Sequence, residues 1–425
     1  MEARARTTLA LPSDPSGSAL RRAARLAAPV GACAYVLSFA IPARIDYSLL
    51  LLAACAAVAL FASDDTSASR RVNPLVIAIL CFCAATVVSL FVSINLARSF
   101  IVSTALLPAL LLFVIIGYGF SSPGHVRGLL LAFTAVALGL GSALTAIALR
   151  DSAGASSDWV AALESPILVV PNDVALLAVL LPAYLLPLRL RPRSVAGVAG
   201  AMAAAITLLA CVALQSRTAL LTALVSMTAL AMLWRSRALL IVTLTTPVAA
   251  LIVDQVFLGG HLTAKFASFW DARLSLWVTA WQMFVDAPLV GNGPNTFGAL
   301  YPQYIAALEM PGILPVDGRV VPWPHNLYLE MLAERGFVGL CALLFVIGAA
   351  ARIGWRLRKA QDAETRLLAT TVLACLVGVA FSGLLELTLL RLWVVVLTFV
   401  LLGMLQYLSR YAAMRPRVAP VARRQ

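Results

Sequence analysis

Long apolar runs separated by short polar connections make up most of the chain. A run of about 20 apolar residues is long enough to cross a bilayer as a helix. We count about twelve such runs, with predicted limits at 26–43, 46–62, 73–94, 99–120, 127–149, 172–190, 194–214, 218–234, 238–258, 336–355, 366–386 and 390–409. The pattern predicts an all-α, polytopic membrane protein with about 12 transmembrane helices, because a helix satisfies its own backbone hydrogen bonds inside lipid.

One long polar interval interrupts this alternation. Residues 259–335 gather His, Asn, Asp, Glu, Arg and Trp together with Gly and Pro, so we expect this interval to lie outside the hydrocarbon. We predict a large helical loop between helices 9 and 10 that carries the chemistry. The predicted units are a cytoplasmic tail, transmembrane helices 1–9, a periplasmic catalytic loop, transmembrane helices 10–12 and a second cytoplasmic tail, at residues 1–25, 26–258, 259–335, 336–409 and 410–425.

Three short helices are predicted inside this loop. Apolar residues recur at helical spacing from Ala272 to Phe284, which predicts an amphipathic helix that Pro288 ends. Tyr301 to Ile305 suggest a second helix. A third is expected from about Asn326 to Glu334, and Gly336 should stop it before the next transmembrane helix begins.

Composition and charge place this fold in a membrane with a defined orientation. Of 425 residues, 62% are hydrophobic and 12% charged, and the formal net charge is +13. The basic residues fall in short clusters between apolar runs, which topology explains better than nucleic-acid binding does. The positive-inside rule predicts two cytoplasmic termini and a periplasmic loop, as for a multi-pass protein of the bacterial inner membrane. All seven cysteines lie in apolar runs, so we expect no disulfide and no metal site.

Two arginines are the first candidates for chemistry. Arg217 stands between two apolar runs on the predicted outer side, where the alternative role is to reach lipid phosphates at the interface. Arg273 opens the amphipathic helix and has Asp271 as an alternative partner. Two guanidiniums that converge on one side of the membrane are suited to binding a diphosphate and stabilising it as a leaving group. We expect Asp173 or Glu386 to pair with Arg217 or Arg391.

His325 is the candidate base. A histidine can take a proton from an attacking hydroxyl, because an unperturbed imidazole titrates near neutral pH. The helix N-terminus expected at Asn326 would favour a nearby anion. A lone histidine is more often a helix-end or core residue, so this role depends on its neighbours. Glu330 and Glu334 share one helix face, and we expect that face to be solvated or structural rather than catalytic.

These motifs together resemble the signature of the bacterial O-antigen ligase and O-antigen polymerase superfamily, and the chain is most similar to an O-antigen ligase. The resemblance covers mainly residues 170–345. The matching positions are Pro171-Asn172, Ser216-Arg217-Thr218, Arg273 with Trp277 and Ala280, Pro288-Leu289-Val290-Gly291-Asn292-Gly293 with Phe297, and Pro324-His325-Asn326 with Tyr328-Leu329, Glu334, Gly336 and Gly339.

The resemblance implies a metal-independent, inverting glycosyltransferase without a cofactor. Its donor would be a glycan on undecaprenyl diphosphate and its acceptor a sugar hydroxyl of lipid A core, in lipopolysaccharide assembly. Carried over by position, Arg217 and Arg273 hold the diphosphate and His325 activates the acceptor. Many members have a second histidine two residues earlier, where this chain has Trp323; the Pro-His-Asn match favours His325. The residues expected to line the substrate site are Asn326, Gly291, Gly293, Trp277, Trp281 and Tyr328.

Other functions remain open at this point. Within the superfamily, the alternatives are an O-antigen or exopolysaccharide polymerase and a protein O-oligosaccharyltransferase. A lipid-linked glycan flippase or a secondary transporter belongs to a different class. A transporter should carry charges near the midplane of several transmembrane helices, whereas here they gather at the outer ends and in one loop. No nucleotide-binding or metalloprotease motif is present.

Overall fold

The described part of the chain is all-helical. The computed structural model describes residues 15–38, 52, 54–55, 73–152, 174–214, 216–257, 271–307, 323–386 and 388–414. The helices in these ranges are α1 (Pro15–Ser38), α3 (Pro74–Phe91), α4 (Leu96–Ser103), α5 (Leu106–Gly119), α6 (Pro123–Ser152), α8 (Val174–Val179), α9 (Leu181–Leu190), α10 (Val195–Ala213), α11 (Arg217–Leu233), α12 (Arg237–Phe257), α14 (Asp271–Asp286), α15 (Phe297–Ala307), α16 (Leu327–Leu357), α17 (Ala363–Ser382) and α18 (Leu392–Met414).

These helices follow the predicted apolar runs closely. Seven segments in the described ranges are long and apolar enough to cross a membrane. Shorter apolar helices coincide with four further predicted runs, at Leu26–Ser38, Val174–Leu190, Arg217–Leu233 and Arg237–Ala249. The predicted run 46–62 lies almost entirely outside the described residues. The helical class is therefore confirmed, while the count of twelve transmembrane helices stays a prediction.

Polar residues at the chain's turns define where several helices begin. Asn73 precedes α3, and its side chain accepts a hydrogen bond from the backbone N–H of Leu75 at 3.0 Å. Ser216 caps α11 and Asp362 caps α17 in the same way. Each cap satisfies a backbone donor that the first helical turn leaves without a partner. The short polar connections thus set the boundaries of the apolar helices.

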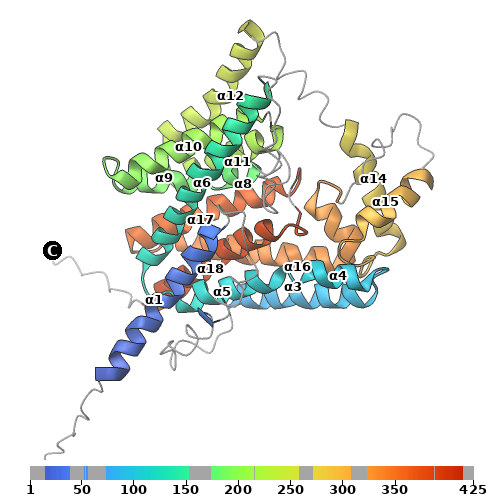
Figure 1. Ribbon diagram of the computed structural model, residues 1–425, viewed down its shortest axis with the longest axis horizontal. Coiled ribbons are helices and arrows are strands. Elements are labelled where there is room, and N and C mark those ends of the chain that lie inside the picture. The colour runs from blue at the N-terminus through green and yellow to red at the C-terminus, as the bar shows by residue number, and fades with distance from the viewer. Residues whose placement is uncertain are drawn as a thin grey trace, which may run out of the picture.

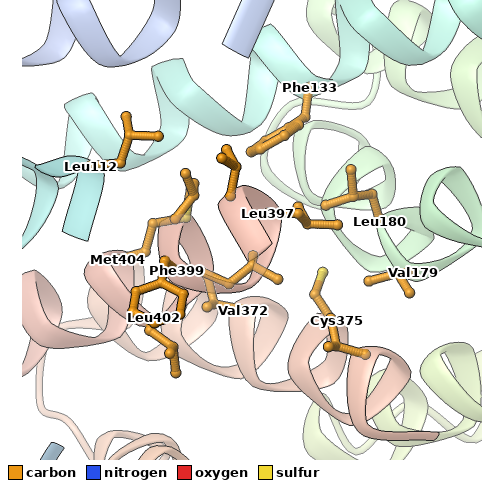
Figure 2. Close-up of a cluster of buried hydrophobic side chains, with 14 of the residues drawn as sticks. Leu112, Phe133, Val179, Leu180, Val372, Cys375, Leu397, Phe399, Leu402 and Met404 are labelled. Carbon is orange, nitrogen blue, oxygen red and sulfur yellow. The ribbon is translucent and has the colours of Figure 1, made fainter. Parts of the chain in front are cut away.

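The core lies around α18. This helix packs against α5, α16 and α17. Among the seven helices that could cross a membrane, its apolar segment is the most deeply buried. Figure 2 shows Leu112 of α5, Phe133 of α6 and Cys375 of α17 converging on Leu397 and its neighbours in α18. A helix that is apolar on all sides is expected at such a central position.

Two groups of helices extend from this centre. On one side, α6 packs against α10, while α11 packs against α8, α12 and α17. On the other side, α3 runs along α16, and α14 and α15 lie over the same end of α16 (Figure 1). The two short helices predicted here are confirmed as α14 and α15. The apolar face predicted for α14 is wrong, because Leu274 and Trp281 are about half exposed while Leu276, Ala280 and Met283 are buried. The residues from 258 to 270 and from 308 to 322 that connect this region to its neighbours lie outside the described ranges.

The break predicted at Gly336 exists, and a turn from the loop fills it. α16 has one residue with non-helical angles, Gly336, at φ 63° and ψ −165°. The backbone N–H groups freed beyond the break, on Phe337 and Val338, donate to the carbonyls of Pro288 and Leu289 at 2.8 and 3.1 Å. Both helical segments continue on either side, so α16 spans Leu327–Leu357 as one interrupted helix.

The carbonyls before the break are satisfied by the same turn. Ala333 and Glu334 accept from the N–H groups of Asn292 and Gly293, at 3.1 and 2.9 Å. Gly291 lies against this backbone with φ 68°, and a Cβ there would come within 2.3 Å of the carbonyl carbon of Glu334. Glycine at position 291 therefore lets the turn approach the backbone of α16 closely, which a residue with a side chain would prevent.

We expect Gly336→Ala to destabilise the protein by about 3 kcal/mol or more, because a positive φ and a steric clash act together. A Cβ at Gly336 would lie 2.4 Å from the carbonyl group of Leu289, whereas one at Gly348, in the same helix, meets no atom within 4 Å. Gly348→Ala is therefore the matched control. Thermal denaturation of both variants in detergent measures the difference, and equal midpoints would show that the interrupted helix tolerates a side chain.

Candidate active site

Four chain segments bring the candidate residues to one place. Arg273 lies in the first turn of α14, and Arg217 is the first residue of α11. His325 precedes the N-cap of α16, and Glu386 lies between α17 and α18. Helix ends hold these side chains, so their positions follow from how the helices pack rather than from one local motif.

The carboxylate of Glu386 joins Arg273 to His325. One carboxylate oxygen lies 3.1 Å from a guanidinium nitrogen of Arg273, and the other lies 3.0 Å from Nδ1 of His325. The second terminal nitrogen of Arg273 donates to the backbone carbonyl of Leu385. The side chains of Glu386, Arg273 and His325 are 6%, 12% and 26% exposed. Because these contacts are largely shielded from water, they are stronger than surface ion pairs.

The structure gives Glu386 two partners that the sequence did not indicate. The sequence suggested Arg217 or Arg391, and Glu386 contacts Arg273 and His325. Asp271 was the alternative partner considered for Arg273, which meets the carboxylate of Glu386 from a segment more than one hundred residues away. In the sequence, Glu386 could be recognised as an acidic residue at the outer end of an apolar run. That position limits its partners to residues on the outer side but does not identify them.

His325 is held by its neighbours through one ring nitrogen, Nδ1. Its backbone has φ 52°, an uncommon conformation for a residue with a side chain. Asn326 caps α16 by accepting from the N–H groups of Tyr328 and Leu329, at 3.0 and 3.1 Å, so the helix start predicted there is confirmed. A neutral imidazole that donates its Nδ1–H to Glu386 keeps a lone pair on Nε2. This tautomer is the one that can accept a proton.

The two candidate arginines act on each other electrostatically. Burial lowers the pKa of Arg273, the carboxylate of Glu386 opposes this effect, and the charge of Arg217 lowers the pKa further. Arg217 is half-buried at the start of α11, where the helix N-terminus is itself positive. Like charges held close together are costly, and an anion between them removes that cost. The arrangement therefore suits a ligand with more than one negative charge.

Trp323 lies beside the same imidazole and stacks with Arg391. The ring centroids of Trp323 and His325 are 5.3 Å apart, and the guanidinium carbon of Arg391 lies 4.5 Å from the Trp323 ring centroid. Burial lowers the pKa of Arg391 to about 10, which still leaves it charged at neutral pH. Arg391 follows Glu386 closely in the chain, so the segment between α17 and α18 contributes both residues.

Several residues expected to line the substrate site make structural contacts. Gly291 and Gly293 supply the turn at the break in α16. The Tyr328 hydroxyl donates to the carbonyl of Ala380 at 2.7 Å and ties α16 to α17. Asn326 caps its helix, as described above. A role of these residues in substrate binding stays a prediction.

The two tryptophans of α14 differ in their surroundings. Trp277 is half-buried and packs against the small apolar cluster formed by α14, α15 and α16. Trp281 is 52% exposed, and its ring lies 5.3 Å from that of Phe284. Exposed tryptophans are common where a protein meets the headgroup region of a membrane. Trp281 fits that role, and for both tryptophans contact with a substrate stays a prediction.

Glu330 and Glu334 are fully buried, so the expectation of a solvated face was wrong. Glu334 accepts hydrogen bonds from the backbone N–H groups of Asn295 and Phe297, at 2.8 and 3.2 Å, and pairs with Arg335 at 3.5 Å. Glu330 is buried beside Thr388 and Leu389. Glu334 holds the turn against α16, which agrees with the structural role considered for this face.

Comparison with known families gives one match. A family model described as O-antigen ligase matches residues 201–345, a range that contains Arg217, Arg273 and His325. No curated protein matches the chain. Within the part of the chain that the structure describes, no group of three or more His, Cys, Asp or Glu side chains is placed to hold a metal ion.

Proposed function

We propose, from the assignment to the O-antigen ligase superfamily that the match over residues 201–345 supports, that this protein is a membrane glycosyltransferase of the ligase type. It transfers a glycan from undecaprenyl diphosphate to a sugar hydroxyl of lipid A core. The reaction takes place on the periplasmic face of the bacterial inner membrane. The residues from 259 to 335 form the catalytic loop, and both termini are cytoplasmic.

The observation that carries this proposal is the link that Glu386 makes between Arg273 and His325. Transfer from a diphosphate donor needs a cation at the leaving group and a base at the acceptor, a few ångströms apart. One carboxylate that holds a guanidinium and an imidazole sets that spacing. It also fixes the imidazole tautomer, as acids do in other histidine-dependent enzymes.

The reaction is a single displacement. Nε2 of His325 takes the proton of the acceptor hydroxyl, and the hydroxyl oxygen forms a bond to the anomeric carbon of the donor. The bond between that carbon and the diphosphate oxygen breaks, and its electron pair leaves with the diphosphate. Arg217 and Arg273 stabilise the charge that develops there. Attack from the face opposite the leaving group inverts the anomeric configuration.

We expect His325→Ala to lower the rate of glycan transfer by about 10²- to 10⁴-fold, the usual contribution of a general base. The assay combines purified protein, lipid-linked glycan and lipid A core, and follows the product by gel shift. His125→Ala is the matched control, because His125 lies at the start of α6 and its Nδ1 accepts from the N–H of Ser121. It should transfer glycan at the wild-type rate.

Three outcomes would contradict this proposal. Wild-type rates in the His325→Ala variant would remove His325 from the mechanism. Chain growth of the glycan without added lipid A core would identify a polymerase instead of a ligase. Movement of the donor across the membrane without any transfer would place the protein with flippases.

A further inference from the structure

The connection between α17 and α18 carries Glu386, so its position decides where that carboxylate lies. The connection comprises residues 383–391. Ahead of Glu386, the carbonyl of Gly383 accepts a hydrogen bond from the backbone N–H of Leu327, the first residue of α16, at 2.6 Å. At Glu386 itself, one carboxylate oxygen lies 3.0 Å from Nδ1 of His325, just before α16. The start of α16 is therefore the surface against which this connection is placed.

Glu330 provides a contact beyond Glu386. It lies in the first turn of α16, and its side chain is fully buried. The hydroxyl of Thr388 and the backbone N–H of Leu389 are the groups of the connection that act on its carboxyl. Thr388 is also fully buried, and its hydroxyl oxygen accepts from the N–H of Leu390 at 3.1 Å. One turn of α16 thus holds the connection on both sides of Glu386, and loss of either hold would let the carboxylate shift.

The charges around Glu330 favour its neutral form. Glu334, one helical turn further on, has the partners that an ionised carboxylate needs, because it pairs with Arg335 at 3.5 Å and accepts two backbone N–H groups. Both acids and Arg335 are buried, and a second carboxylate in this place would be excess negative charge away from water. A protonated Glu330 avoids that cost. It then has one O–H group to donate and one oxygen to accept.

We propose that Glu330 is a positioning residue, which holds the carboxylate of Glu386 in reach of His325. In this role its O–H group donates to the hydroxyl oxygen of Thr388, and its other oxygen accepts from the N–H of Leu389. Glu330 touches no substrate and acts through Glu386. The proposal rests on the proposed transferase function and deepens it, because it names the residue on which the spacing between the cation and the base depends.

The first test replaces Glu330 with leucine and with glutamine. Leucine has about the same size and brings no polar atom, so thermal stability in detergent should be unchanged or higher. The kcat for transfer should nevertheless fall by about tenfold to a hundredfold, because small displacements of reacting groups cost rates of that order. KM for the lipid-linked donor should change less than about twofold, because Arg217 and Arg273 remain. Glutamine can donate and accept as the neutral acid does, so Glu330→Gln should keep kcat within about threefold of wild type.

Two further variants accompany this pair. Glu364→Leu is the matched control, since Glu364 also lies in the first turn of a helix, α17, but is 39% exposed. It should leave kcat unchanged. Thr388→Val removes the hydroxyl at the other end of the proposed contact while keeping the shape, so it should lower kcat as Glu330→Leu does. It also provides the measurement if Glu330→Leu does not fold.

The tautomer of the imidazole separates a positioning role from a general loss of structure. The chain has three histidines, so the ¹⁵N signals of His325 in histidine-labelled protein are identified by their absence in His325→Ala. Wild type and Glu330→Gln should show the proton on Nδ1, where Glu386 accepts it. Glu330→Leu should show a mixture with the Nε2–H form, because the carboxylate no longer holds Nδ1–H in place. In the Glu386→Gln background, Glu330→Leu should lower kcat by less than about twofold further, since the contact through which it acts is already lost.

The proposal is overturned if Glu330→Leu keeps the wild-type kcat, or if kcat falls while the ¹⁵N signals of His325 stay as in wild type. Equal losses in Glu330→Gln and Glu330→Leu would overturn it as well, because an ionised carboxylate would then be required. These results leave the transferase function intact, since that function is judged by His325→Ala. Conversely, wild-type transfer by His325→Ala, together with a tautomer of His325 that changes in Glu330→Leu, would retain the positioning role and reject the proposed base.

Discussion

The Glu386→Gln substitution is expected to lower the transfer rate by about 10²- to 10⁴-fold, although glutamine has nearly the same shape as glutamate. The wild-type carboxylate accepts from both Arg273 and His325. An amide has one oxygen and one NH₂ group, and Arg273 has donors alone. The amide oxygen must therefore face Arg273, and the NH₂ group faces Nδ1 of His325. The imidazole then carries its proton on Nε2 and cannot accept one there.

Glu364→Gln is the control for this effect. Glu364 also pairs with an arginine, Arg127, at 3.4 Å, but the two side chains are 39% and 45% exposed. Surface pairs of this kind contribute between zero and about 1 kcal/mol, so stability and transfer should both stay at the wild-type level. Rates measured with purified proteins of equal thermal stability decide the question. Normal transfer by Glu386→Gln would mean that the tautomer of His325 has no part in the reaction.

The sequence was sufficient for the features that depend on neighbouring residues. Apolar runs place most of the described helices within a few residues, because a transmembrane helix must be apolar over its own length. The first helix is an exception, since α1 begins at Pro15, inside the predicted cytoplasmic tail. The start of the last loop helix and the break after it could also be predicted. Asn326 as a cap and Gly336 as a break are local signals, since capping and positive φ are decided by the residue itself and its near neighbours.

The contacts that assemble the site could not be read in this way. Glu386 lies 61 residues from His325 and 113 from Arg273, and no pattern in the sequence states which outer acid meets which base. The role of Glu334 depends on distant residues in the same way. Its face was expected to be solvated or structural, and the structural role follows from backbone N–H groups of a turn that comes from 39 residues earlier in the chain. Burial of a carboxylate depends on such distant donors.

Trp323 illustrates the same limit at a single position. In the sequence it stands at a position where many members of the superfamily that the chain resembles have a histidine. Either that position or His325 could therefore have been the place of the base. In the fold, Trp323 contacts both the candidate base and Arg391, a residue from another segment. Its ring can stack but cannot take a proton, so the substitution supports His325 as the base and gives the position a different use.

Arg217→Ala is expected to lower the transfer rate by about 10²- to 10³-fold, the effect of removing one group that stabilises a developing negative charge. Its loss should leave the fold intact, because the side chain of Ser216, rather than that of Arg217, caps α11. It should also remove a repulsion, since the charge of Arg217 lowers the pKa of Arg273. Thermal stability in detergent should therefore be unchanged or slightly higher.

Arg237→Ala is the matched control for this variant, because Arg237 is the exposed first residue of the next helix, α12. Binding of inorganic pyrophosphate should weaken in Arg217→Ala and stay constant in Arg237→Ala. Arg217→Lys should fall between them, since lysine offers a point charge without the bidentate fork. If Arg217→Ala kept wild-type kcat and pyrophosphate affinity, Arg273 alone would have to hold the diphosphate. Arg273 shares its charge with Glu386, so it needs a second cation to balance a diphosphate, and such a result would assign that second cation to a residue other than Arg217.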